Sequence, residues 1–282
     1  MSFNIAIMCK VLKVDRSSYY HWLKHSPTTS KRDHKLDELT QLIFTRSYQT
    51  YGTRRIKDKL IHTHGVIVSR RRIRSIMQHL GLAAKARKRF KMRTTDSSRN
   101  LPIAPNLLQR DFNASSPNEK YVGDITYIPT KEGWLFLATV IDLYSRKIVG
   151  WSMSDNMKTS LVNDALKMAI HTRKPSRGLL WYTDRGSQYA SYEHKDLLTQ
   201  YGIVQSMSAK GNCLDNAVAE SFFHTLKTEL THHEVYHTRR QAKQSIFEYI
   251  EVFYNRERIH SANNYLSPMR FEEKMLDEKM VS

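Results

Sequence analysis

Apolar residues recur at helical spacing in the stretch that follows residue 211. At about 100° per residue, one stripe contains Ala219, Phe222, Phe223, Leu226 and Leu230. Glu220, His224 and Lys227 fall on the neighbouring arc, and Asp215 or Asn216 can cap the first turn by accepting from backbone N–H groups. The pattern predicts a helix beginning just before Glu220 that packs on a core and carries a carboxylate and a lysine at the border of the packed face.

The first hundred residues also show helical spacing. Residues 4–25 predict two short helices interrupted near Val14, with Ser17 or Ser18 opening the second. These two helices resemble half of a helix-turn-helix, but many small helical packings look the same, so a DNA-reading role for them stays open. Residues 35–46 predict a third helix with Leu36, Leu39, Ile43 and Leu42 as inward candidates.

Residues 51–82 carry the start and stop signals of two further helices around a tight turn. Thr53 can cap the first helix and Gly65 can end it, while Ser69 can cap the second and Gly81 can close it. The apolar positions expected to face inward are Ile56, Leu60, Ile73, Ile76, Met77 and Leu80. This arrangement predicts a helix-turn-helix.

After residue 117 the pattern changes from helical spacing to alternation. The segment 121–128 alternates as a strand, which places Val122, Asp124, Thr126 and Ile128 on one face. Apolar strands are also predicted over 134–142 and 147–153, and the short turns between them favour an antiparallel meander.

The order of the elements after the meander indicates the fold. A helix over 159–171 opening at Thr159 or Ser160, a strand over 179–184, a helix over 192–201 and a strand over 203–207 precede the helix that carries Glu220. Three strands followed by alternating helices and strands is the order of the ribonuclease H-like fold. We therefore predict an α/β chain in which a ribonuclease H-like mixed sheet with flanking helices follows an all-α helix-turn-helix basic arm.

Charge is distributed unevenly along the chain. The 282 residues carry a net charge of +18, and residues 1–100 hold 23 Lys and Arg against 6 Asp and Glu, whereas the remainder holds 22 against 21. A basic arm attached to a neutral domain points to nucleic acid as the partner, with affinity that falls steeply with salt. The basic candidates for phosphate contact are Arg54, Arg55, Arg70, Arg71, Arg72, Arg74, Lys85, Arg87, Lys88 and Arg89, the alternative being a solvated basic face.

Composition excludes several other classes of protein. No apolar run approaches the roughly 20 residues needed to span a bilayer, and the first residues lack the layout of a signal peptide, so we expect no membrane association and a cytoplasmic location. Cys9 and Cys213 are too few and too far apart for a disulfide framework or a zinc site.

Three acids are candidates for a metal site. Asp124 interrupts an apolar strand, Asp184 ends another, and the ribonuclease H-like order brings these two strands side by side with Glu220 on the final helix against them. Three carboxylates would repel one another, and two divalent ions such as Mg²⁺ would relieve that repulsion. Asp142 and Asp215 are weaker candidates, the first as a stabiliser of its turn and the second as a helix cap.

The spacing of these acids and the sequences around them match a known family. Between the acids lie 59 and 35 residues, within YVGDITYI, WYTDRGSQYAS and SAKGNCLDNAVAESFFHTLKTEL, and Lys227 follows Glu220 by seven. The chain resembles the DDE transposases of insertion sequences, of the second-reading-frame (OrfB) type of the insertion-sequence three family, which are relatives of retroviral integrases. YGTRRIKDKL, SRRRIRSIM and the C-terminal YNRERIHSANNYLSPMRFE extend the resemblance over nearly the whole chain.

The resemblance implies phosphoryl transfer on double-stranded DNA, with Asp124, Asp184 and Glu220 as catalytic and metal-binding residues for two Mg²⁺ or Mn²⁺ ions. It implies that Lys227 contacts a phosphate near the transposon end, and that Tyr182 or Gln188 helps to position DNA. The expected partners are transposon ends and target DNA, a homo-oligomer on that DNA, and an upstream-frame (OrfA) product or fusion, all at the bacterial nucleoid. A non-transposing nuclease of the same fold and a catalytically silent DNA-binding regulator are the alternatives.

The same reasoning divides the chain into five segments. We expect a short helical segment over 1–30, a helix-turn-helix DNA-binding domain over 31–82, a basic linker over 83–116, the catalytic core over 117–232 and a C-terminal helical extension over 233–282.

Overall fold

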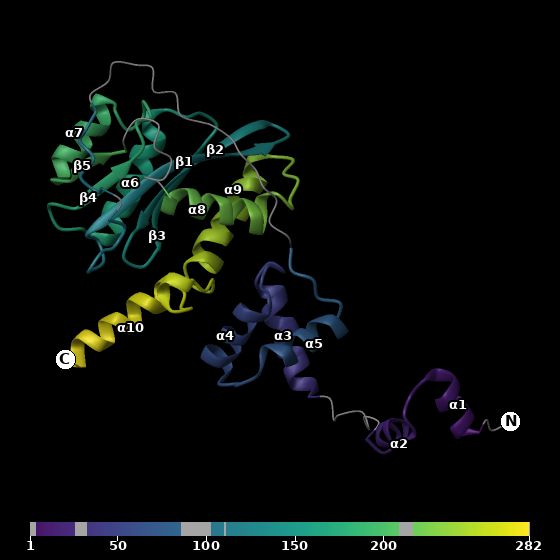
Figure 1. Ribbon diagram of the computed structural model, residues 1–282. Coiled ribbons are helices and arrows are strands. Elements are labelled where there is room, and N and C mark those ends of the chain that lie inside the picture. Colours follow the sequence, from purple (N-terminus) through teal and green to yellow (C-terminus); the bar gives the residue numbers. More distant parts are fainter. Residues whose placement is uncertain (1–3, 26–32, 86–102, 110, 209–216, 282) are drawn as a thin grey trace. The chain divides into compact units, whose positions relative to one another are not determined.

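The computed structural model describes residues 4–25, 33–85, 103–109, 111–208 and 217–281 (Figure 1). The chain forms two compact units, one over Met1–Leu39 and one over Thr40–Ser282.

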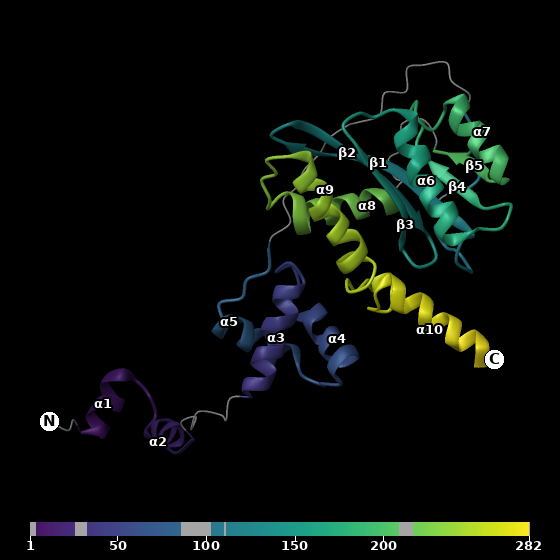
Figure 2. The ribbon, with the colours of Figure 1, turned by 180° about the vertical axis from the view of Figure 1, so that it is seen from behind.

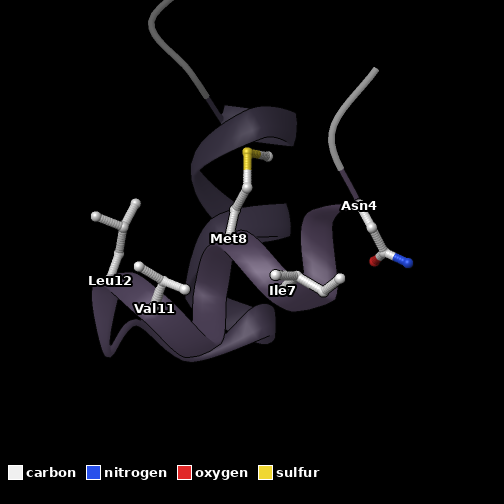
Figure 3. Close-up of a pocket in the computed structure, with 5 residues that line it drawn as sticks. All are labelled: Asn4, Ile7, Met8, Val11 and Leu12. Carbon is white, nitrogen blue, oxygen red and sulfur yellow. The ribbon is translucent and has the colours of Figure 1, made fainter. Parts of the chain in front are cut away.

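The first unit contains two short helices, α1 (Ile5–Leu12) and α2 (Arg16–His25), and the beginning of α3 (His34–Arg46). The Asn4 side chain caps α1 by accepting from Ala6 N at 2.9 Å. The sequence prediction that Ser17 or Ser18 opens α2 is wrong, because the helix begins at Arg16, one residue before Ser17 and two before Ser18, and Tyr19 N donates to Asp15 O. Much of α1 is exposed and not packed against the other described residues of this unit. A pocket on it is lined by Asn4 and by the apolar side chains Ile7, Met8, Val11 and Leu12 (Figure 3).

The second unit begins with the helix-turn-helix. Helices α4 (Thr53–His64) and α5 (Arg70–His79) are separated by Gly65, whose φ of 64° ends α4 in the left-handed conformation. Ser69 caps α5 as predicted, accepting from Arg72 N at 3.2 Å. Thr53 is the first residue of α4 and not its cap, because Gly52 occupies the capping position without a side-chain bond.

The apolar predictions for these helices are largely confirmed. The inward residues of α4 and α5 are buried, namely Ile56, Leu60, Ile73, Ile76 and Met77, while Leu80 is half-buried. In α3, Leu36 and Ile43 are buried. Leu42 is 42% exposed because it lies on the side of the helix away from the packed face.

A five-stranded mixed sheet forms the centre of the second unit. Strands β1 (Lys120–Thr130), β2 (Gly133–Asp142) and β3 (Ile148–Ser154) make the predicted antiparallel meander. Strands β4 (Leu180–Thr183) and β5 (Val204–Met207) add on the other side of β1 in parallel, giving the order β3-β2-β1-β4-β5. This is the ribonuclease H-like arrangement, with β1 at its centre.

Helices cover both faces of the sheet. Helix α6 (Thr159–Arg173) packs on β2 and β3, and α7 (Tyr192–Tyr201) on β5, on the face turned to the viewer in Figure 2. Helix α8 (Ala217–Leu226) packs against β1 on the opposite face. Neither Thr159 nor Ser160 caps α6, because Lys158 holds the capping position and Thr159 is already helical.

The chain after α8 is helical but irregular. Helix α8 continues into a π-helical turn over Lys227–Thr231, and α9 (Arg239–Phe247), capped by Thr238, continues into a second π-helical segment over Glu248–Tyr254. A 3₁₀ turn (Ser261–Asn263) and α10 (Pro268–Val281) follow. The predicted stripe of Ala219, Phe222, Phe223, Leu226 and Leu230 is buried throughout, whereas the proposed caps Asp215 and Asn216 lie outside the described residues.

Candidate active site

Asp124 lies in the central strand of the sheet. It pairs across to Thr139 of β2, and its side chain shares the α8 face of β1 with Val122 and Thr126. Its Oδ1 accepts from the backbone N–H of Ile125 at 2.7 Å, which fixes the orientation of the carboxylate. The strand therefore places a single acid, with a set orientation, among uncharged neighbours.

Asp184 comes to the same face because of the parallel register between β1 and β4. Val122 pairs with Tyr182, so the residues two further along the chain from each are Asp124 and Asp184. Asp184 Oδ1 accepts from Gly186 N at 2.9 Å in the tight turn that follows β4. A side chain at residue 186 would begin 3.0 Å from that same oxygen, so glycine keeps the approach to the carboxylate open.

Glu220 comes from the first turn of α8, where most of its side chain is exposed and the carboxyl end is partly removed from water. Burial raises its pKa, and its own negative charge contributes to the raised pKa of Asp124. Because α8 packs on β1, the helix brings this third carboxylate into the electrostatic field of the other two. The strand register brings Asp184 beside Asp124, and the packing of α8 on β1 brings Glu220 toward both.

The charges at the site act on one another. Burial raises the pKa of Asp124 well above its usual value, and the carboxylates of Asp184 and Glu220 raise it further, against the opposing effects of Ile125 N–H and Lys227. Lys227, directly after α8, is half-buried and has its Nζ 4.9 Å from the centroid of the Tyr127 ring. The site thus combines excess negative charge with one nearby ammonium.

The donor set determines which ion could bind. Three carboxylates offer only hard oxygen ligands, which suit Mg²⁺ or Mn²⁺, and their mutual repulsion is what a divalent cation would offset. Within the described part of the chain, no three His, Cys, Asp or Glu side chains are already gathered as a metal cage. The residues therefore fit such ions by the chemistry of their oxygen ligands and by their negative charge.

A buried polar network supports the strand that leads to Asp184. Trp181 Nε1 donates to His194 Nε2 at 2.9 Å, and His194 Nδ1 lies 2.7 Å from Asn163 Oδ1, so the imidazole is neutral with its proton on Nδ1. Burial lowers the pKa of His194 to about 4. The indole ring of Trp181 lies against Gly123, the residue before Asp124, and leaves no room for a Cβ there.

Tyr189 lies near the acids, and the sequence reasoning did not single it out. Its pKa is raised well above the usual value by burial and then by the charges of Asp124 and Asp184. The sequence signal that could have pointed to it is its position shortly after Asp184, at the end of the segment DRGSQY.

Of the two weaker acidic candidates, Asp142 does not join the site. Asp142 is fully buried and accepts from Tyr144 N and Asn118 N, both at 2.9 Å, which confirms its predicted role in its turn. Burial raises its pKa to about 6. Asp215 lies outside the described residues.

The predicted phosphate contacts fall into three groups. Exposed on α4 and α5 are Arg54, Arg70, Arg71, Arg72 and Arg74. Arg55 instead lies 3.4 Å from Glu229 Oε1 and over the Tyr51 ring, and Lys85 is half-buried with its backbone N bonded to Gln49 O. Arg87, Lys88 and Arg89 lie outside the described residues.

Two further buried carboxylates were missed by the sequence analysis. Glu229 pairs with Arg258, and Glu272 pairs with Arg173, each through two N–H···O bonds of 2.8–3.0 Å. Arg258 and Glu272 lie in the C-terminal stretch Tyr254–Glu272 that the sequence analysis quoted. No spacing or periodicity in that stretch indicates either pair.

Comparison with protein families agrees with this geometry. Residues 114–213 and 220–276 match two integrase core domain families, and residues 31–90 match an HTH-like domain family. The first two ranges contain Asp124 and Asp184, and Glu220, respectively. The part of the chain that is described contains no helix long and apolar enough to cross a membrane.

Relatives of the chain match it almost from end to end. It is 44% identical over 277 residues to transposase InsF for insertion sequence IS3A of Escherichia coli (strain K12), covering 97% of this chain and 96% of that protein. It is 43% identical over 268 residues to an insertion element IS600 uncharacterized 31 kDa protein of Shigella sonnei, covering 95% and 98%. Among solved structures, a simian T-cell lymphotropic virus intasome in complex with PP2A regulatory subunit B56 gamma matches with a TM-score of 0.49 at 17% identity, covering 83% of this chain and 74% of that one.

Proposed function

This chain belongs to the IS3 family of DDE transposases, and we propose that Asp124, Asp184 and Glu220 are the carboxylates at which it cleaves and joins DNA. Its activity is that of a transposase, which cuts DNA and transfers strands in the movement of an insertion sequence. The roles of the individual residues are the part that we propose.

One observation carries the assignment. Asp124 is fixed in the central strand, and its pKa is raised by burial and then by the charges of Asp184, which follows a neighbouring strand, and Glu220, which comes from a helix. Groups of like charge brought together by separate elements are costly unless they have a function. This supports a catalytic site at these three residues.

The carboxylates suit two Mg²⁺ or Mn²⁺ ions. Asp124, Asp184 and Glu220 would hold such a pair, which would supply activation of the attacking hydroxyl and compensation of charge on the leaving oxygen. In Asp124 and Asp184 one oxygen accepts from a backbone N–H, which holds each carboxylate in a set orientation toward the shared face. Glu220 completes the ligand set from α8.

DNA contacts are proposed for the basic groups around the site. Lys227 holds its ammonium over Tyr127 beside Asp124, which suits a contact to a phosphate at the transposon end. Gln188, whose Nε2 donates to Met157 O, would help to position the strand, whereas Tyr182, the other candidate from the sequence, is 1% exposed and does not reach the surface. The exposed arginines of α5 would contact phosphates farther along the duplex.

The proposed partners follow from the reaction. Joining two transposon ends to a target brings three DNA segments together, which favours several copies of the chain on DNA and, as the family resemblance implies, an upstream-frame product or fusion. Since the substrate is chromosomal DNA, we place the protein in the cytoplasm at the bacterial nucleoid.

The proposal is tested by strand transfer on labelled DNA that carries the end of the element, with Mg²⁺ or Mn²⁺. Asp184→Asn should abolish joined product, whereas Asp164→Asn, the same change at an exposed acid of α6, should retain it. Cleavage without joining by the unmodified chain would indicate a nuclease. DNA binding with neither cleavage nor joining, also after fusion to the upstream-frame segment, would indicate a silent regulator.

A further inference from the structure

Glu229 lies just beyond the residues that carry the proposed chemistry. It belongs to the π-helical turn Lys227–Thr231, two residues after Lys227 and nine after Glu220, which is about two and a half helical turns. Only 5% of it is exposed, although it is a carboxylate. A buried acid at the end of the helix that carries Glu220 requires partners that explain its burial.

Both oxygens of Glu229 are bound by groups from distant parts of the chain. Arg258 donates from Nε to Oε2 at 2.9 Å and from Nη2 to Oε1 at 2.8 Å, and the hydroxyl of Tyr249 donates to Oε2 at 2.7 Å. Burial raises the pKa of Glu229, but Arg258 outweighs that effect and holds it below its usual value. The carboxylate is therefore ionised, and each of its two oxygens is held by a hydrogen bond from Arg258.

Arg258 is equally well held. It is 4% exposed, its guanidinium lies 5.8 Å from the centroid of the Tyr254 ring, and its Nη1 is 3.3 Å from His260 Nε2. Burial, followed by the nearby arginine charges, holds the pKa of His260 well below its usual value, so the imidazole stays neutral and can accept. Arg258 is thus held in place by its own contacts and cannot easily follow a movement of the helix that carries Glu229.

The helix-turn-helix meets the same carboxylate. Arg55 of α4 lies 3.4 Å from Glu229 Oε1, and Tyr51 OH accepts from Ile259 N at 2.9 Å, next to Arg258. Lys59 of α4 pairs with Glu257 at 2.7 Å. Helix α4 and the end of the α8 helix are therefore attached to one segment, residues 257–259.

We propose that Glu229 is a positioning residue for strand transfer, whose buried ion pair with Arg258 sets the position of the helix that carries Glu220 and Lys227. A bidentate pair has a direction, so it fixes both the rotation of the helix and its position along its axis. The π-helical turn needs such a restraint, because widened helical turns are uncommon and persist where the surroundings hold them. Through Arg55 the same restraint connects α8 to the DNA-binding helices. This inference rests on the proposed role of Glu220.

Glu272 provides a matched control in the same chain. It is 6% exposed, accepts from Arg173 at 2.9 and 3.0 Å, and also binds Lys147 and Ser145, but it lies in α10. Glu229→Gln and Glu272→Gln therefore remove the same charge from the same kind of buried pair. Only the first of them removes it from the helix of Glu220.

The experiment compares these two variants of the full chain by three measurements: amide hydrogen exchange in α8, Mn²⁺ affinity by paramagnetic resonance titration without DNA, and strand-transfer rate. Glu229→Gln should speed exchange in α8, weaken Mn²⁺ binding and slow strand transfer, the last by about 10- to 100-fold, as expected for a misplaced catalytic group. Glu272→Gln should leave exchange in α8 and Mn²⁺ affinity unchanged. Equal effects of both variants on all three measurements would overturn the proposal.

A second variant covers the case in which Glu229→Gln does not fold. Replacing both partners, as Glu229→Met with Arg258→Met, removes the pair without leaving a buried charge and should retain the fold. It should still show faster exchange in α8 and slower strand transfer, and normal values of both would contradict a positioning role. Glu220→Gln separates the two proposals. If this variant joins DNA normally, the proposed active site is wrong. If it is inactive but the Glu229 variants behave like the wild type, the active site stands and only the positioning role of Glu229 is wrong.

Discussion

The ammonium of Lys227 lies 4.9 Å from the centroid of the Tyr127 ring, which joins the end of α8 to the central strand β1. The side chain of Lys227 is long and would otherwise be mobile. The ring holds the ammonium beside β1, close enough to Asp124 for the charge of Lys227 to act on the pKa of that residue. A lysine held in place loses less entropy when it contacts a phosphate.

Removing the ring should therefore weaken DNA binding without removing a charge. We expect Tyr127→Leu to lower the affinity for the transposon end about 2- to 10-fold with no change in salt dependence, as for one long side chain that is no longer held. Lys227→Met should lower the affinity and also reduce the slope of log affinity against log salt by about 1. Binding titrations at several salt concentrations measure both, and equal slopes for both variants would contradict a phosphate contact by Lys227.

Neutralising one acid should stabilise the protein when no metal is bound. Because Asp184 raises the pKa of Asp124, Asp184→Asn should increase the free energy of unfolding by about 1–2 kcal/mol at about pH 8 in the presence of a chelator. The pKa of Asp124 is raised on folding, so the wild type loses stability as pH rises through that pKa, and the variant should lose less. Addition of Mn²⁺ should stabilise the wild type more than the variant. Urea unfolding with chelator and with Mn²⁺ tests this, and a variant that is less stable in chelator would refute it.

The buried imidazole of His194 should make stability depend on pH. Its pKa is lowered to about 4, so the unfolded chain takes up the proton first as pH falls below about 6.5, and the loss of stability is complete near pH 4. Between about pH 7.5 and about pH 5 this costs about 2 kcal/mol. Asp142, with a pKa of about 6, changes stability in the opposite direction over part of this range.

The difference between the wild type and His194→Gln isolates the effect of the imidazole, since Asp142 is present in both. Glutamine can accept from Trp181 and donate to Asn163, so the fold should be retained. Urea titrations at the two ends of that pH range should show a smaller loss for the variant. Parallel losses would mean that His194 is protonated in the folded protein.

Gly123 should be the position in β1 least able to accept a side chain. A Cβ there would meet the indole of Trp181, so we expect Gly123→Ala to lower the free energy of unfolding by about 1–3 kcal/mol and to slow strand transfer by displacing Asp124. The smaller ring in Trp181→Phe should make the alanine less costly. Stabilities of the two single variants and the double variant form a cycle, and strict additivity would show that the two residues do not collide.

The sequence alone determined the elements and their order. Ser69 caps α5 and Gly65 ends α4 because these signals act through backbone groups a few residues away. The alternation in 121–128 placed Asp124 on one face, and the stripe on α8 placed Glu220 beside a buried surface, since both follow from the repeat of the backbone itself. Where these local signals misled at Thr53 and Thr159, the predicted helix start was wrong by only one position. At both, the predicted cap is the first residue of the helix.

Only the tertiary structure decided which charges meet. Arg55 reads in the sequence as one more basic residue of a DNA-binding arm, yet its guanidinium lies 3.4 Å from Glu229, 174 residues away. Arg258 and Glu229 are separated by 29 residues, and no periodicity connects them. The energy of an ion pair depends on distance and burial in space, neither of which is encoded in residue spacing, so the restraint on the helix of Glu220 appears only when the chain is folded.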